Sequence, residues 1–419
     1  MPELDFWVII FFRFVLYAPS SMTFAFQLII LFCLLGACMA ISLHLFCIPK
    51  LQPVRWSKEE APLVSILVPA RNEALNIQAC VQSLLAQNYP NFHVCVLDDH
   101  STDQTGPIVR QLGLTQENGG LISGQDLPPG WVGKNWACHQ LSLAAKGDYL
   151  LFTDADTVHS PDTLGALVAA SREHDAALLS AWPRQEVISF GEKLVVSLLP
   201  FAGIVFYPHF LLGVLGRYPE WRRSVPAWLR RRLGAANGQV MFFSRSGYVA
   251  IGGHESVRNH LVEDVALGRG VASRMTEGLW WVNCDASGLV KCRMYRCFGE
   301  VWEGFSKNAR AAFEESEAAF WVAGFGQFSV FVLPFIWAGL SWPGDGLAWV
   351  QVALILLLRI VATIGVGGAW WSVVLHPIAY MLGMLIALNS WRCSVGRGVR
   401  WKGRVYSVEH PLNTPKQSS

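Results

Sequence analysis

The sequence predicts an α/β protein with a mostly parallel sheet flanked by helices, joined to α-helical membrane segments. Two observations lead to this fold class. From residue 63 to residue 153, short apolar runs rich in β-branched residues alternate with helical patterns, as strands and crossover helices do in parallel sheets. In addition, 52% of the 419 residues are hydrophobic and only 15% are charged, a composition typical of membrane proteins.

The first long apolar segment covers residues 23–48. Its length of about 26 residues is enough to cross a hydrocarbon core roughly 30 Å thick, so we expect a transmembrane helix. The stretch Phe6–Tyr17 before it is apolar but short, and Arg13 and Pro19 break it. We therefore expect the segment 1–22 to lie at the membrane interface. A cleavable signal peptide does not fit, because the apolar run is too long and no small-residue cleavage site follows it.

The residues after this helix indicate the compartment. Lys50, Arg55 and Lys58 follow it, and the positive-inside rule then predicts a cytoplasmic domain on a multi-pass protein of the inner (cytoplasmic) membrane. The ten cysteines form no CxxC pair, which fits buried thiols in a reducing compartment rather than a disulfide framework or a zinc site.

The first two strands of the soluble part each run into a polar loop. Residues 63–68 are followed by Pro69-Ala-Arg-Asn-Glu73, and residues 93–97 are followed by the acidic loop 98–103. Asp103 or Thr102 is expected to cap the next helix, and this role is favoured for Asp103 over binding a ligand. The carboxyl ends of parallel strands meet at one edge of a sheet, so both loops are expected at that edge.

A third strand, Tyr149–Thr153, ends in Asp154-Ala-Asp156. Two carboxylates at positions i and i+2 can share Mg²⁺ or Mn²⁺, and such a cation can bridge the oxygens of a diphosphate. The spacing alone is weak evidence, because Asp is common in solvated turns. Its place after a buried strand favours the metal site.

Residues 190–232 are expected to form a membrane-associated insertion in the soluble domain. Pro200 and Pro208 interrupt its apolar part, which favours helices on or dipping into the bilayer surface over a span. Its basic part, residues 221–232, interleaves Arg with Trp. This pattern fits membrane lipids with anionic headgroups, and we expect no nucleic-acid partner.

The soluble pattern then resumes up to residue 310. Residues 235–243 are interpreted as a strand, Glu263-Asp264 opens a helix, Trp280 begins another strand, and residues 300–308 are expected to form an amphipathic helix.

Three further apolar stretches, residues 318–342, 347–366 and 369–388, are each near the length of a spanning helix. Three crossings would place the basic tail, residues 389–419, on the far side of the membrane from the soluble domain, whereas its charge predicts the cytoplasm. Either one stretch is re-entrant or interfacial, or the insertion crosses the membrane. Arg359 is expected to face protein or water.

Four motifs in this order resemble the family 2 glycosyltransferases with the GT-A fold, over residues 63–310: Pro69–Glu73, Val96–Asp103, Asp154–Asp156 and Glu263–Asp264. Residues 128–137, 293–295 and 304–308 are similar to the membrane branch that glycosylates carotenoid acids, such as 4,4'-diaponeurosporenoate, and hopanoid-related lipids. The Gln/Arg-x-x-Arg-Trp signature of processive synthases and ceramide glucosyltransferases is not found.

The resemblance implies a role for each matching residue. It implies a metal site at Asp154 and Asp156 and a catalytic base at Asp264. A UDP-sugar would be bound by Pro69, Arg71, Glu73, Asp98, Asp99, Lys134 and Asp154. The acceptor and diphosphate side would include Glu263, Arg293, Trp302, Lys307 and Asn308.

Purely structural interpretations remain open for several of these residues. Glu73 and the Glu263-Asp264 pair can be acids at helix starts, and Lys134 can be a solvated surface lysine. Trp302 and Phe305 can be anchors of an interfacial helix.

The predicted function is a membrane-bound inverting glycosyltransferase that moves one sugar, with glucose favoured, from a UDP-sugar to a lipid acceptor such as a carotenoid acid or another polyisoprenoid. The alternatives are a processive polysaccharide synthase, for which the apolar segments are few, and a non-catalytic membrane scaffold of the same fold.

Overall fold

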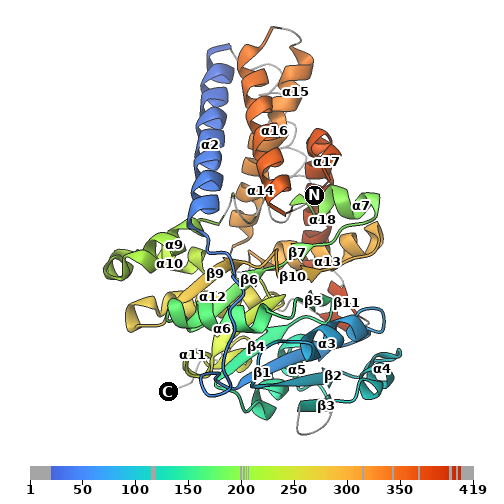
Figure 1. Cartoon of the computed structure of the whole chain (residues 1–419). Coiled ribbons are helices and arrows are strands. Elements are labelled where there is room, and N and C mark those ends of the chain that lie inside the picture. The colour runs from blue at the N-terminus through green and yellow to red at the C-terminus, as the bar shows by residue number, and fades with distance from the viewer. Residues whose placement is uncertain are drawn as a thin grey trace, which may run out of the picture.

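The computed structural model (Figure 1) describes residues 20–406 except for 115–118, 199–200, 202, 204, 206, 314–315, 342–343, 367–368, 396–398 and 403. An α/β domain forms its lower part, and long apolar helices rise above it. The predicted interfacial segment 1–22 lies outside the described residues except for its last three positions.

The α/β domain is built on a seven-stranded sheet with strand order β3-β2-β1-β4-β8-β6-β9. The strands β3, β2, β1 and β4 are parallel, β8 runs antiparallel to both of its neighbours, and β6 and β9 are parallel. The mostly parallel sheet is therefore confirmed. Its strands are β1 (Val64–Ala70), β2 (Phe92–Asp98), β3 (Gly119–Ser123), β4 (Tyr149–Thr153), β6 (Leu178–Trp182), β8 (Val240–Ser244) and β9 (Trp281–Asp285).

Helices cover the sheet because the strands are apolar on both faces. The inner strands β1, β2 and β4 are almost entirely buried, as parallel strands between helical layers are. Helix α5 packs on β1 and β2, and α6 packs on β6 and β8. The helices of this domain are α3 (Ile77–Leu85), α4 (Thr105–Gln111), α5 (Gly133–Ala144), α6 (Thr163–Glu173), α11 (Arg245–Ala250) and α12 (Glu263–Ser273), with 3₁₀ turns at Gly253–Glu255 and Met275–Glu277.

Some elements were not predicted correctly from the sequence. The edge strand β3 begins with Gly119 and Gly120, both at positive φ. It has too few apolar residues to show the alternation of apolar and polar residues that predicts a strand. Residues 235–239 were interpreted as strand but form a loop, and β8 starts only at Val240. The loop begins with small residues whose backbone lies against α12, so packing rather than strand pairing fixes its conformation.

A second, smaller sheet positions the segments around the loop that follows β4. It has the order β5-β10-β7, from β5 (Thr157–His159), β10 (Val290–Cys292) and β7 (Arg184–Gln185). It ties the loop after β4 to the segment before α13 (Phe298–Ala311), and the main-chain N–H of Arg293 donates to the carbonyl of Asp156 at 3.1 Å.

The described residues of the segment 190–232 include short helices. These are α7 (Phe190–Val195), α9 (Phe210–Arg217), the 3₁₀ helix η1 (Pro219–Ser224) and α10 (Ala227–Leu233). A capping box between Ser189 and Glu192 starts α7. Helix α9 packs on α2 and β9, and α10 packs on α12.

Within the part of the chain that the structure describes, four apolar helices are long enough to cross a membrane: α2 (Ser20–Cys47), α14 (Glu317–Phe331) with α15 (Leu333–Leu340), α16 (Gly346–Val366) and α18 (His376–Val395). Pro334 follows the break between α14 and α15, since proline removes a helical hydrogen bond. Arg359 of α16 is buried and donates to the carbonyl and hydroxyl of Ser197 at 2.8 and 3.0 Å. It faces protein, as expected.

The last apolar stretch returns toward the α/β domain. The short helix α17 (Trp371–Val374) precedes α18, which packs on α13 and α7. Figure 1 shows α18 descending beside α13. A hairpin of β11 (Val399–Trp401) and β12 (Arg404–Tyr406) follows and packs on α13. The main-chain carbonyl of Lys402 in this hairpin accepts a hydrogen bond from Arg71, so the chain after α18 contacts the α/β domain.

A glycine contact positions α12 and the loop 234–239 beside it. A Cβ at Gly268 would overlap the carbonyl oxygen of Gly234 and lie 3.0 Å from the Cβ of Ala236. At Gly270, on the same helix, the nearest atom to an added Cβ is 3.9 Å away. The loop 234–239 can therefore approach α12 only because residue 268 has no side chain.

We predict that Gly268→Ala lowers the free energy of unfolding by about 1–3 kcal/mol, because the loop must move away from α12. The matched control Gly270→Ala is expected to be neutral or to stabilise by up to about 1 kcal/mol, because Ala is the better helix former. Thermal unfolding of the detergent-solubilised variants measures both. Equal stability of the two variants would show that the close contact does not position the loop.

Candidate active site

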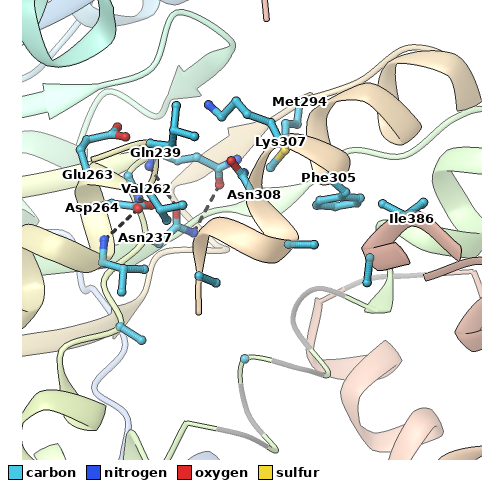
Figure 2. A pocket seen from close by; sticks show the side chains of 18 of the residues that line it. Asn237, Gln239, Val262, Glu263, Asp264, Met294, Phe305, Lys307, Asn308 and Ile386 are labelled. Atoms are coloured by element: carbon cyan, nitrogen blue, oxygen red, sulfur yellow. Dashed lines mark hydrogen bonds between the residues drawn. The ribbon is translucent and has the colours of Figure 1, made fainter. Parts of the chain in front are cut away.

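A cavity of about 2450 Å³ extends from the acidic edge of the sheet to the helices α14 and α18. Its domain end is lined by carboxylates and basic side chains, and its other end by apolar side chains of the membrane helices. Figure 2 shows this gradient: Glu263 and Asp264 lie at one end of the view, and Phe305 and Ile386 lie at the other. A polar site and an apolar chamber are thus continuous.

Lys134 joins two of the predicted motifs. Its ammonium group lies 2.7 Å from a carboxylate oxygen of Asp154 and 2.8 Å from one of Glu263. Lys134 stands in the first turn of α5, whereas its partners follow β4 and begin α12. Burial alone would lower the pKa of Lys134, but the two carboxylates raise it well above its usual value. Lys134 is therefore a charged bridge and not a solvated surface lysine.

Glu263 and Asp264 are neighbours in sequence, but their pKa values are shifted in opposite directions. Burial would raise the pKa of Glu263, but Lys134, Lys307 and hydrogen bonds lower it. The pKa of Asp264 is raised to about 6, by burial first and then by the Glu263 charge. Glu263 is thus held as an ion, while Asp264 can exchange a proton near neutral pH.

The loop before β8 orients Asp264. The main-chain N–H of Gly238 donates to its Oδ2 at 2.8 Å, and the N–H of Val265 donates to its Oδ1 at 2.8 Å. A Cβ at position 238 would lie only 2.9 Å from Oδ2, so glycine permits the approach. Gln239, next in this loop, donates to the thiol of Cys292 at 2.9 Å. Figure 2 shows the loop beside Asp264.

Asp156 lies near two other carboxylates, those of Asp154 and Glu73. Its pKa is raised to about 7 by burial and by the charges of Asp154 and Glu73, against which Lys402 acts. The thiol of Cys292 donates to it at 3.5 Å. Three carboxylates therefore share one region of the cavity, and such crowding is relieved when a cation binds.

The loop after β1 is held to the loop after β2. Arg71 donates to the carbonyl of Asp99 at 2.5 Å, and the main-chain N–H of Glu73 donates to the hydroxyl of Thr105 at 2.7 Å. Asp103 accepts from the N–H groups of Ala74 and Thr105 at 3.0 and 2.9 Å. Asp103 thus braces the two loops, a role close to the predicted cap. The Glu73 carboxylate forms an ion pair with Lys402.

Helix α13 contributes the wall opposite Asp264. Lys307 is buried enough to lower its pKa, although the Glu263 charge acts in the other direction. Asn308 lines the cavity beside it, and Figure 2 shows both side chains near Gln239 and Asp264. Arg293, in the segment that leads to α13, lies 4.0 Å from the buried Glu192 carboxylate. Lys307, Asn308 and Arg293 therefore line the same cavity as the Glu263-Asp264 pair.

The structure brings most of the predicted site residues to this cavity. Those that line it are Pro69, Arg71, Glu73, Asp99, Lys134, Asp154, Asp156, Glu263, Asp264, Arg293, Lys307 and Asn308. Asp98 does not: its Oδ1 accepts from the N–H of Ser101, and its Oδ2 lies where a Cβ of Gly106 in α4 would be. Trp302 does not line it either and packs near Phe298.

Sequence reasoning missed two parts of the site. The loop Asn237-Gly238-Gln239 was recognised only as part of a strand, although glycine beside amide residues is a signal for a backbone donor near a ligand. Lys402 was assigned to the basic tail, yet it lines the cavity with Glu73. No local pattern distinguishes it from the other basic residues around it.

Among residues 20–406 outside the gaps given above, no group of three His, Cys, Asp or Glu side chains is arranged to hold a metal ion. The donor set of Asp154 and Asp156 nevertheless suits Mg²⁺ or Mn²⁺ in one respect. Mg²⁺ is commonly held by one or two carboxylates together with water and the phosphates of a substrate. The two aspartates fit such a shared site, and a bound diphosphate would complete it.

Comparisons with known proteins show which proteins this chain is similar to. The pattern of the family described as Glycosyl transferase family 2 matches residues 65–232. A 4,4'-diaponeurosporenoate glycosyltransferase of Staphylococcus aureus (strain MRSA252) is 26% identical over 367 residues, covering 82% of this chain and 88% of the relative. The protein of that name from Staphylococcus haemolyticus (strain JCSC1435) is 24% identical over 371 residues, covering 84% and 90%.

A solved structure resembles the fold over nearly the whole chain. A mannosyltransferase from Pyrobaculum calidifontis, in complex with GDP-Man and Mn²⁺, matches with a TM-score of 0.50 at 16% identity, covering 88% of this chain and 99% of that chain. At this identity the likeness concerns the fold alone. The predicted GT-A fold is confirmed.

We predict that Lys134→Met destabilises the protein by about 2 kcal/mol, because two partly or fully buried carboxylates lose their shared cation. Lys134→Arg should retain most of the stability, because it keeps the charge. The control Lys146→Met removes an exposed lysine and should change the unfolding temperature little. If Lys134→Met unfolds at the temperature of the control variant, the ion pairs do not stabilise this edge.

Proposed function

Because the chain is a glycosyltransferase with a family 2 domain and the GT-A fold, we propose that it transfers one sugar from a UDP-sugar, with glucose favoured, to a lipid acceptor with inversion at the anomeric carbon. The observation that carries this proposal is the continuity of the cavity. One volume joins the carboxylate cluster to the apolar walls of α14 and α18, so a lipid can enter from the bilayer side and meet the donor.

The acceptor class follows from the apolar end of the cavity. Phe320, Phe325 and Phe328 of α14 and Met384 and Leu388 of α18 line it, and a surface of this kind buries a hydrocarbon or polyene chain. The names of the bacterial relatives point to a carotenoid acid as acceptor. A polyisoprenoid acid or alcohol is therefore the proposed class. The same apolar lining disfavours a growing polysaccharide, which would need polar and aromatic walls along its whole path.

The donor side is assigned from the charges. Glu73 and Asp99 are proposed to accept hydrogen bonds from the nucleoside, and Asp154 and Asp156 to hold a divalent cation with the diphosphate. When bound, that cation neutralises the charge of the departing diphosphate. The solved mannosyltransferase holds Mn²⁺ with a nucleotide sugar, which supports a divalent metal.

Asp264 is proposed to act on the acceptor. Its carboxylate is oriented by Gly238 and Val265, and its raised pKa of about 6 makes it a base with appreciable affinity for a proton at pH 7. It can take the proton of an acceptor hydroxyl as the oxygen attacks the anomeric carbon. Lys307, across the cavity, can hold an ionised acceptor carboxyl by its charge, in which case no proton need be removed.

The membrane arrangement is proposed to be multi-pass with the catalytic domain in the cytoplasm. Helices α2, α14 with α15, and α16 would cross, while α17 and α18 re-enter and return. This assignment is supported by the contact of Lys402 with the catalytic domain and agrees with the basic charge of the tail. The proposed location is the inner (cytoplasmic) membrane.

The test is release of UDP from UDP-glucose by the purified full-length protein with a polyisoprenoid acid in detergent micelles. We predict turnover that needs Mg²⁺ or Mn²⁺. For a hydroxyl acceptor, Asp264→Asn should lower kcat by about 10²–10⁴, the usual contribution of a general base. Asp126→Asn, an exposed control, should keep the wild-type rate. Turnover unaffected by metal chelation, or retained in Asp264→Asn, would contradict the assignment.

The same assay gives a pH dependence with a definite sign. A base works only when ionised, so kcat/KM for a hydroxyl acceptor should fall about tenfold for each pH unit below the Asp264 pKa of about 6 and should level off above it. A rate that rises as the pH drops would identify an acid in this position instead.

A further prediction tests the apolar chamber at the end of the cavity near α14 and α18. Met384→Trp should fill part of the chamber and raise KM for the lipid acceptor about tenfold or more, while KM for the sugar donor stays within about twofold. Ile378→Trp is the matched control, because Ile378 lies on the same helix but is exposed. Equal acceptor KM values for both variants would show that the lipid binds elsewhere.

A further inference from the structure

We propose that Lys402, in the hairpin after the last helix, is a donor-binding residue that contacts the diphosphate of the nucleotide sugar. This inference rests on the proposed function, because it names a further residue of the same site. It means that the chain beyond the membrane helices completes the donor pocket.

The position of Lys402 is fixed by its main chain. It occupies the turn between β11 and β12, and its carbonyl oxygen accepts from Nε of Arg71 at 3.1 Å. The same guanidinium donates to the carbonyl of Asp99 at 2.5 Å. Arg71 therefore fastens the hairpin to the two loops that are proposed to hold the nucleoside. Packing of β11 on α13 and α18 supports it from the other side.

The backbone of Lys402 adopts a conformation that L-residues rarely use, with φ of +44°. Such a residue costs free energy and persists where its surroundings hold it in place. The hydrogen bond from Arg71 is one contact that holds it. The conformation directs the lysine side chain to the carboxylate of Glu73, with which it forms an ion pair.

Lys402 lies with the carboxylates at the donor end of the cavity. It lines the cavity together with Glu73, Asp154 and Asp156, and it forms an ion pair with Glu73. Its side chain is 31% exposed, against 13% for Glu73, so the ammonium group can be reached from the cavity.

The chemistry of an ammonium group suits this role. It has three N–H donors, so it can keep Glu73 while donating to a phosphate oxygen, and it binds phosphate as a point charge on a flexible stem. Lys134 is already held between Asp154 and Glu263 at 2.7 and 2.8 Å. Lys402 therefore approaches the diphosphate from the nucleoside side and Lys134 from the acceptor side.

The test compares nucleotide binding with nucleoside binding. Calorimetry on the full-length protein in detergent with Mg²⁺ measures the Kd of UDP and of uridine for wild type, Lys402→Met and Lys402→Arg. The control Lys291→Met removes an exposed lysine paired with Glu186, outside the cavity. If wild type binds GDP instead of UDP, GDP and guanosine are used in the same way.

We expect Lys402→Met to weaken UDP binding about tenfold, as loss of a charge-assisted hydrogen bond does, and to change uridine binding by less than about twofold. Lys402→Arg should stay within about threefold of wild type for UDP, and the control should match wild type.

Two results would overturn this inference alone. In the first, the Lys402→Met variant binds UDP as tightly as wild type does. In the second, it loses affinity for UDP and for uridine equally, which would mean that the hairpin has been displaced. In both cases the proposed function stands if the wild-type protein turns over the donor. Wild type that binds neither UDP nor GDP overturns the proposed function and this inference together.

Discussion

The active site depends on the balance of charge among carboxylates that are withdrawn from water. Glu73, Asp154, Asp156, Glu263 and Asp264 line one cavity, and ionised carboxylates so close together repel one another. Lys134 offsets two of them by lying within 2.8 Å of both Asp154 and Glu263. The remaining excess of negative charge, seen in the raised pKa of Asp156, leaves a place that a cation can fill. A metal-bound diphosphate is a ligand that such a balance suits.

The same cavity explains why the domain is attached to membrane helices. Helix α13 carries Lys307 and Asn308 at the carboxylates, and it packs on α18 along its length. Helix α18 in turn lines the apolar end and leads into the hairpin that reaches Glu73. The proposed donor pocket, the proposed acceptor chamber and the tail are therefore linked through two packed helices. A lipid and a nucleotide sugar, which differ greatly in polarity, can each find a matching environment within one volume.

Local patterns predicted much of this arrangement, though not all of it. The strands β1, β2 and β4 were predicted because buried parallel strands are continuous apolar runs, and the loops after them were predicted to converge because parallel strands end at one edge. The edge strand β3 was missed because it opens with two glycines. Asp98 and Trp302 were named for the site but pack elsewhere, since neighbouring residues on a loop or helix point in different directions and sequence alone does not say which one faces the ligand.

By itself, the sequence determined that this is an α/β protein with apolar helices and that its acidic loops follow strands, since strand period, helix length and turn chemistry are all short-range properties of the chain. Only the tertiary structure decided which carboxylates share a cation, where the last helix turns, and that Lys402 meets Glu73 across 329 residues of sequence. The physical reason is that such contacts arise from packing between distant elements. Their free energy depends on burial and geometry, which no stretch of residues carries alone.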